Sequence, residues 1–204
     1  MSTVGLLYVG AVLFVNSMML LGKVESKSAG IFNLFVGGLQ VFTPLYIIMT
    51  ADGDPWTIFS ASGLFLFGFT YLYVGIGNLI GADSTGVGWY SLWVAIMAVG
   101  YSLVNFIQFQ DVKFGIIWLM WSFLWYLFYL LLAQGKDIGR FTGWVTFIQS
   151  WITCTIPAFL IMIDSWSAIS SPTGVIIGIG LFIVFGVLYF QHRGSAISNA
   201  DVGA

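Results

Sequence analysis

Charged residues are scarce in this sequence. Asp, Glu, Lys and Arg make up 7% of its 204 residues, whereas 59% are hydrophobic and the mean hydropathy is +0.99. Globular domains carry about 25% charged residues, and a chain with so few polar side chains has no means of solvating a separate soluble domain. The composition therefore predicts an integral membrane protein that forms a single bundle.

Cysteine and histidine occur once each. The single cysteine, Cys154, excludes an intrachain disulfide and a cysteine metal cluster, and its apolar surroundings favour a small buried side chain. The one histidine, His192, stands beside Arg193 after the last apolar run, which is typical of a basic flank that anchors a helix. We expect no metal site and no cofactor, and the net charge of −2 gives no reason to expect a nucleic acid partner.

Catalytic motifs are missing as well. The sequence has no HExxH, no GxSxG, no P-loop and no paired carboxylates, so the usual chemistry of hydrolysis has no residues to perform it. No Asp, Glu, Lys, Arg or His side chain lies well inside an apolar run, although pumps driven by protons or ions depend on such groups. We expect no catalytic residues and no enzyme activity, and the same absence weighs against ion-coupled transport.

Long apolar runs dominate the sequence instead. A membrane-spanning helix needs about 20 apolar residues to cross a hydrocarbon core of about 30 Å. Seven runs meet or approach that length: Val4 to Leu21, Gly30 to Met49, Trp56 to Ile80, Gly88 to Phe109, Phe114 to Ala133, Thr142 to Ile163, and Val175 to Phe190. The sequence therefore predicts an all-α polytopic membrane protein, a bundle of seven transmembrane helices.

The basic residues in the links predict the orientation of this bundle. If the spans alternate in direction, one side of the membrane holds only Lys113, and the opposite side holds Lys23, Lys27, Lys136, Arg140 and Arg193. Basic residues concentrate on the cytoplasmic side of membrane proteins. The N-terminus is therefore predicted to lie outside and the C-terminus in the cytoplasm.

Three tryptophans lie in the middle of the fifth run. Trp118, Trp121 and Trp125 are spaced i, i+3 and i+7, so on a helix their indoles follow one face over two turns. Tryptophan in membrane proteins usually gathers at the two interfaces with water, and these three lie far from both. Packing along a helix seam or contact with lipid explains them as well as a functional role does.

A depth count finds partners for these indoles. At about 1.5 Å per residue, Leu13, Phe67, Tyr71 and Trp125 lie roughly 13 to 20 Å from the outer end of their spans, and Gln149, counted from the inner end, lies near the same level. Such a layer suits a narrow path for small, neutral, planar solutes, because apolar walls discourage ions that cannot shed water. Gln149 offers a donor and an acceptor, which matches an amide or urea.

Several short motifs on successive runs carry a family resemblance. They are LLYVGAVL at Leu6 to Leu13, FNLFVGGL at Phe32 to Leu39, LFGFTYLY at Leu66 to Tyr73, WYSLWVAI at Trp89 to Ile96, IIWLMWSFLW at Ile116 to Trp125, GRFTGW at Gly139 to Trp144, and IPAFL at Ile156 to Leu160. Their order makes the match specific. Over its first 163 residues the sequence resembles the urea/amide channel family, AmiS/UreI.

The resemblance implies passive, bidirectional passage of urea or short-chain amides through a pore inside each protomer. It also implies that six protomers form a homohexameric ring in the bacterial inner membrane. Carried over motif by motif, it implies a pore lined by Leu6, Val9, Leu13, Phe67, Tyr71, Trp118, Trp121, Leu124 and Trp125. Those positions largely coincide with the layer found by the depth count.

The sequence departs from acid-activated urea channels in three places. Those channels carry a long, histidine-containing periplasmic loop after the second helix, where this chain has only TADGDP. They carry a glutamate on the sixth helix, where this chain has Gln149, and losing that charge-assisted acceptor favours aliphatic amides over urea. Residues 165–204 have no counterpart, so we expect a six-helix core at 1–164 followed by an extra transmembrane helix and a cytoplasmic tail.

These features together predict an amide channel without acid gating, with an aromatic-lined pore that passes short-chain amides and urea to a cytoplasmic amidase or urease. A coupled secondary transporter of amides is one alternative. A non-conducting membrane sensor or scaffold is the other.

Acidification should leave the solute flux of this protein unchanged. Lowering the external pH from about 7 to about 5 titrates histidine, and the links predicted to lie outside contain none. Stopped-flow light scattering of vesicles that contain the protein should give equal acetamide and urea rates at both pH values. A several-fold rise at the lower pH would contradict the absence of acid gating.

Overall fold

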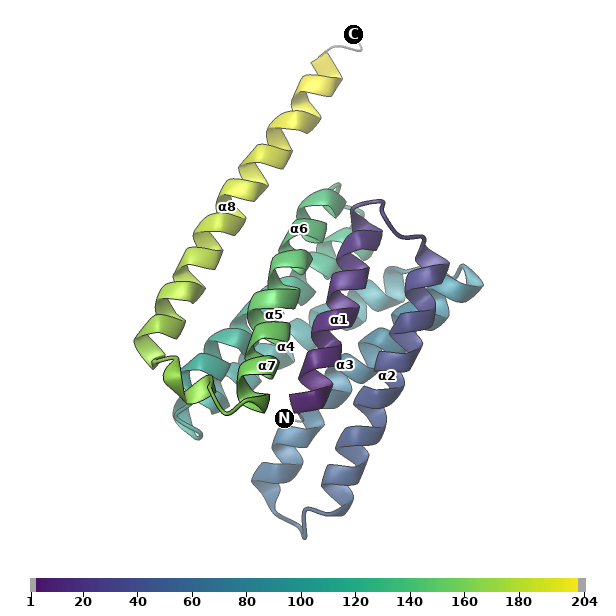
Figure 1. Ribbon diagram of the computed structural model, residues 1–204. Coiled ribbons are helices and arrows are strands. Elements are labelled where there is room, and N and C mark those ends of the chain that lie inside the picture. Colours follow the sequence, from purple (N-terminus) through teal and green to yellow (C-terminus); the bar gives the residue numbers. More distant parts are fainter. Residues whose placement is uncertain (1–2, 202–204) are drawn as a thin grey trace.

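The computed structural model describes residues 3–201, without the side chains of 192–201, and its described part is helical throughout, with no strand (Figure 1). The elements are α1 (Thr3–Leu20), α2 (Ser26–Met49), α3 (Pro55–Ile80), α4 (Thr85–Ile107), α5 (Val112–Leu132), α6 (Gly139–Gln149), the π-helical segment η1 (Ser150–Thr155), α7 (Ile156–Met162), the 3-10 turn η2 (Trp166–Ala168) and α8 (Ser171–Asp201). Because α6, η1 and α7 join into one span, seven segments are long and apolar enough to cross a membrane. The predicted fold class is confirmed.

The span limits agree with the predicted runs to within a few residues. Asp54 caps α3 by accepting the backbone N–H of Thr57 at 2.7 Å, and Asp111 caps α5 by accepting that of Phe114 at 3.0 Å. A carboxylate at a helix N-terminus satisfies donors that have no partner inside the helix. His192 and Arg193, the predicted basic flank, have side chains outside the described part.

Two tight antiparallel pairs, α2 with α3 and α4 with α5, make up much of the bundle. Gly30 and Gly75 bring α2 and α3 so close that a Cβ on either would lie 3.0 to 3.1 Å from the carbonyl oxygen of the other. In the second pair, the Ser102 hydroxyl donates to the carbonyl oxygen of Gly115 at 2.7 Å. Small residues and interhelical hydrogen bonds are the usual means of joining helices in membranes.

The π-helical segment η1 interrupts the regular α-helix of the sixth span. Pro157 has no N–H, and its ring would collide with the carbonyl group four residues earlier in a regular α-helix. The chain instead widens, and the N–H of Ile156 bonds to the carbonyl oxygen of Trp151, five residues back. The predicted run from Thr142 to Ile163 is confirmed as a span, but its apolar pattern did not predict this widening.

Helix α1 packs directly on η1. A Cβ added to Gly10 would collide with Thr155 Oγ1 and would lie 3.0 Å from the carbonyl oxygen of Ser150. Thr155 Oγ1 in turn donates to that same Ser150 oxygen at 2.8 Å. The absence of a side chain at Gly10 therefore allows α1 to contact the widened turn.

The last helix, α8, lies along one side of the bundle against α5 and α6, and its C-terminal part extends beyond the other helices (Figure 1). Lys113 Nζ on α5 donates to the carbonyl oxygens of Trp166 and Ile169, each at 2.9 Å, just before α8 begins. Further along, Phe185 stacks on Phe123 with ring centroids 5.8 Å apart. Helix α8 is thus held against α5 at two places, near its beginning by Lys113 and further along by Phe123.

Replacing Gly10 with alanine should destabilise the protein by about 1 to 3 kcal/mol, the usual cost of overpacking a tight contact, because the new methyl group must displace η1. Gly38→Ala is a matched control, since a Cβ there meets nothing within 4 Å. Thermal unfolding in detergent should show a lower midpoint for Gly10→Ala only. Equal midpoints for the two variants would show that the contact between α1 and η1 is not tight.

Candidate functional site

The three indoles of α5 face the interior of the bundle. Trp118, Trp121 and Trp125 are all buried, and the ring of Phe67 on α3 contacts each of them, with centroid distances of 6.0, 4.9 and 4.8 Å. Trp121 meets Phe67 edge to face at 84° and meets Trp118 in the same way at 81°. This geometry is the favourable one for aromatic pairs, and it means that the indoles do not face lipid.

Two cavities lie on either side of this aromatic cluster. The outer cavity, at the end predicted to face outside, has a volume of about 330 Å³ and includes Leu6, Leu64 and Trp118 in its lining. The inner cavity, toward the end predicted to be cytoplasmic, has a volume of about 110 Å³. Both are large enough for a few molecules of the size of water, each of which takes about 30 Å³ in the liquid.

On α3 and α5, a single layer of side chains separates the two cavities. On α5, Trp118 lines the outer cavity and Trp121 the inner one; on α3, Leu64 and Phe67 are divided in the same way. Each pair is three residues apart, which corresponds to about 4.5 Å along a helix axis. The cavities therefore approach each other end to end, with the rings of Phe67 and Trp121 between them.

The structure assigns the predicted site residues to three places. The outer cavity is lined by Leu6 and Trp118, and the inner cavity by Leu13, Phe67, Tyr71, Trp121, Leu124 and Trp125. Val9 and Gln149 are fully buried but belong to neither lining. Eight of the ten residues thus line two cavities on the same axis, and the role of all ten as a pore lining stays a prediction.

Gln149 lies behind the layer. Its side-chain Nε2 donates to the carbonyl oxygen of Met120 on α5 at 3.0 Å, so the side chain joins α6 to α5. Its Oε1 has no hydrogen-bond partner within the described part of the chain. The depth count placed Gln149 at the correct level, but depth does not determine which way a side chain points around the helix axis.

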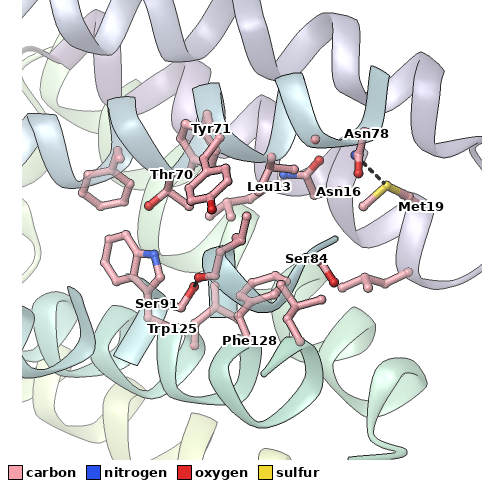
Figure 2. Close-up of a pocket in the computed structure, with 18 of the residues that line it drawn as sticks. Leu13, Asn16, Met19, Thr70, Tyr71, Asn78, Ser84, Ser91, Trp125 and Phe128 are labelled. Atoms are coloured by element: carbon pink, nitrogen blue, oxygen red, sulfur yellow. Dashed lines mark hydrogen bonds between the residues drawn. The ribbon is translucent and has the colours of Figure 1, made fainter. Parts of the chain in front are cut away.

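Both walls of the inner cavity carry aromatic and polar side chains (Figure 2). Tyr71, Leu13 and Asn16 lie on one side, and Trp125 and Phe128 lie opposite. Asn16 is held by a reciprocal pair of amide hydrogen bonds with Asn33 on α2, at 3.0 and 2.6 Å. The Tyr71 hydroxyl has no hydrogen-bond partner among the described side chains, which leaves it available to a solute.

Helix α4 contributes to the lining of both cavities with residues that were not predicted from the sequence. Tyr101 lines the outer cavity and stacks on Trp118, with ring centroids 4.6 Å apart and planes at 18°. Its hydroxyl lies 2.6 Å from that of Ser62. The available signal was a stripe of small and polar residues at helical spacing, namely Ser91, Ala95, Ala98, Ser102 and Asn105, which are all buried.

Charge occurs only at the mouths of the cavities. Among the lining residues of the described chain, Asp111 is the one ionisable acid of the outer cavity and Asp83 that of the inner cavity, and both lie in links. Thr85 donates its hydroxyl and its backbone N–H to Asp83, which lowers the pKa of that carboxyl group, so Asp83 stays ionised in mild acid. Between the mouths the lining is uncharged. Within the described residues, no group of three His, Cys, Asp or Glu side chains could hold a metal ion.

Comparison with known proteins gives a consistent result. A family model described as AmiS/UreI family transporter matches residues 1–165. A Rhodococcus erythropolis protein described as the transporter AmiS2 is 55% identical over 163 residues, 79% of each chain. A Mycolicibacterium smegmatis protein described as a transporter of amidate substrates is 48% identical over 185 residues, 90% of this chain and 87% of the relative.

Among solved structures, the cryo-EM structure of the Helicobacter pylori urea channel in its closed state matches with a TM-score of 0.75 and 33% identity. The match covers 81% of this chain and 100% of that one, so α8 lies beyond the shared fold. The family model matches most of this chain, and two relatives share about half of their aligned residues with it. This multi-pass membrane protein therefore belongs to the AmiS/UreI family of transporters.

Proposed function

We propose that the protein is a passive channel for short-chain aliphatic amides and urea, with one pore inside each protomer. The observation that carries this proposal is the end-to-end arrangement of two cavities, separated by one layer of aromatic side chains and uncharged between their mouths. In this proposal, movement of the rings of Phe67 and Trp121 makes the path continuous. The pore is then lined by the eight cavity residues named above, with Val9 and Gln149 supporting them from behind.

The chemistry of the path suits small, flat, neutral solutes. At the layer, the faces of Phe67 and Trp121 offer apolar contact without charge, and ions that cannot shed their water are discouraged there. On either side of the layer, the indole N–H groups of Trp118 and Trp125 and the hydroxyl of Tyr71 have no hydrogen-bond partner among side chains 3–191. These weak donors favour entry of a carbonyl group without holding it, which conduction requires.

The substrate class rests on the relatives and on Gln149. One relative is described as a transporter of amidate substrates, and the structural neighbour is a urea channel. At the position where the resemblance places a glutamate in the urea channel, this chain has the neutral Gln149, whose amide donates to the backbone of Met120. An amide side chain adds no negative charge behind the layer, which supports a preference for aliphatic amides.

We further propose a homohexamer in the bacterial inner membrane that supplies a cytoplasmic amidase or urease. In this proposal the channel core comprises residues 1–164, and residues 165–204 add the peripheral helix α8 and a cytoplasmic tail. The channel has no acid gate, because the outer links carry no histidine and because Asp83 at the inner mouth keeps its charge in mild acid.

The test of the proposed function is solute flux in vesicles that contain the purified protein. Stopped-flow light scattering should give acetamide and urea permeabilities far above those of protein-free vesicles, with glycerol much slower. A non-conducting sensor or scaffold would leave all three at the lipid baseline. Accumulation of labelled acetamide above equilibrium, abolished by an uncoupler, would show instead that the protein is a coupled transporter.

Truncation of the layer should alter this flux. Trp121→Ala or Trp125→Ala removes an indole from the lining of the inner cavity, so the ratio of acetamide to glycerol permeability should fall by about tenfold, the discrimination typical of one small group in a pocket. Trp93→Ala, which removes an exposed indole of α4, is the control and should leave the ratio unchanged. Gel filtration shows whether each variant keeps its fold and assembly. A well-folded Trp121→Ala or Trp125→Ala protein with an unchanged ratio would mean that these indoles only pack.

A further inference from the structure

The three indoles of α5 differ in one respect. Trp121 Nε1 donates a hydrogen bond to Thr153 Oγ1 in η1 at 2.9 Å. Trp118 and Trp125, one turn to either side, make no such bond with any described side chain or backbone group. The middle indole, which lies at the layer between the cavities, is thus the one whose donor is already occupied.

The direction of this bond is fixed by the chemistry of Thr153. A threonine hydroxyl has one proton to donate and two lone pairs that accept. Thr153 donates its proton to the carbonyl oxygen of Gln149 at 2.7 Å, so only its lone pairs remain for Trp121. Both Trp121 and Thr153 are almost completely buried, and a buried donor that lost this partner would pay the full cost of desolvation.

The contact is part of a closed set of bonds between α5 and the sixth span. Trp121 donates to Thr153, Thr153 donates to Gln149, and the side chain of Gln149 donates to Met120, the residue before Trp121. The turn that carries Thr153 also packs against α1, where Gly10 lies close to Ser150 and Thr155. The position of the Trp121 ring is therefore set by η1.

We infer that Thr153 is a positioning residue that holds the Trp121 indole edge-on to Phe67 and removes its N–H from the path, so that the layer between the cavities offers a permeant no hydrogen bond. This inference rests on the proposed channel function and adds a rule of selectivity to it. A solute must cross one turn of the path without a donor from the wall. Primary amides with a small alkyl end meet this condition better than polyols of similar size, which carry a hydroxyl group on every carbon.

The test is Thr153→Val, which keeps the shape of the side chain and removes the hydroxyl. The ratio of acetamide to glycerol permeability should fall by about fivefold, the equivalent of one neutral hydrogen bond, and Thr153→Ser should restore it. Thr146→Val is the matched control, because Thr146 is equally buried and also donates to the carbonyl oxygen four residues earlier, at 2.7 Å, but contacts no indole through its hydroxyl. The control should leave the ratio unchanged.

A second measurement reports the bond itself. In a ¹H–¹⁵N spectrum of the indole groups, the Trp121 signal, assigned by its loss in Trp121→Phe, should shift upfield in Thr153→Val and return in Thr153→Ser. In the Trp121→Phe background, Thr153→Val should have no further effect on the ratio, since the two substitutions remove the same bond. If the valine variant does not fold, Thr153→Ala replaces it in both measurements.

The outcomes separate this inference from the proposed function. Acetamide flux that persists with an unchanged ratio in Thr153→Val, although the indole signal shifts, overturns the inference and leaves the channel in place. An indole signal that does not move overturns the role of Thr153 directly. If vesicles with the wild-type protein are no more permeable to acetamide than protein-free vesicles, both the channel function and the selectivity rule are wrong. The indole signal still decides in that case whether Thr153 holds the Trp121 ring.

Discussion

A polar group inside a bilayer must find its hydrogen-bond partner within the protein, and the rest of this structure depends on that constraint. Some uncharged polar side chains of the core, such as Ser91 and Thr146, meet it by donating to the backbone of their own helix, and others meet it by bonding across helices. Asn33 pairs with Asn16, Gln40 donates to the carbonyl oxygen of Gly5 at 2.6 Å, and Ser102 donates to that of Gly115. These bonds join α1 to α2 and α4 to α5, and each is worth about 0.6 to 2 kcal/mol in a membrane. They fix which helix faces meet and thereby where the two cavities lie.

The same constraint explains why rings form the layer between the cavities. A charged or strongly polar side chain at this depth would need a partner at all times, and an occupied partner is not available to a solute. The faces of Phe67 and Trp121 need none, and the one polar atom of the layer, the Trp121 N–H, is satisfied by Thr153. In the proposed channel, selectivity therefore comes from the polar groups that the walls lack. Carboxylates appear only at Asp83 and Asp111, where water reaches them.

The sequence was sufficient to predict the seven spans, because hydrophobic length determines where a helix crosses a membrane. Depth along a helix follows from residue number, and four residues that the depth count grouped line one cavity, namely Leu13, Phe67, Tyr71 and Trp125; their role in a pore stays a prediction. Rotation about the helix axis was not predictable from depth alone, as Gln149 shows, and beyond it the π-helical turn at Ser150–Thr155 changes the direction of the side chains that follow. That turn results from Pro157 and from tertiary packing on Gly10, neither of which produces a periodic pattern.

Helix α8 contacts α5 on the face opposite the three indoles. Ile116 and Phe123 contact α8, through Gly178 and Phe185, whereas Trp118 and Trp125 face the cavities. Two residues correspond to about 200° around a helix, so α8 and the indoles lie on opposite faces of α5. The matched family fold ends at residue 165, so the layer is complete without α8. Helix α5 therefore contacts α8 on one face and the sixth span, through Thr153 and Gln149, on another, and the helix that carries the three indoles is held from two sides.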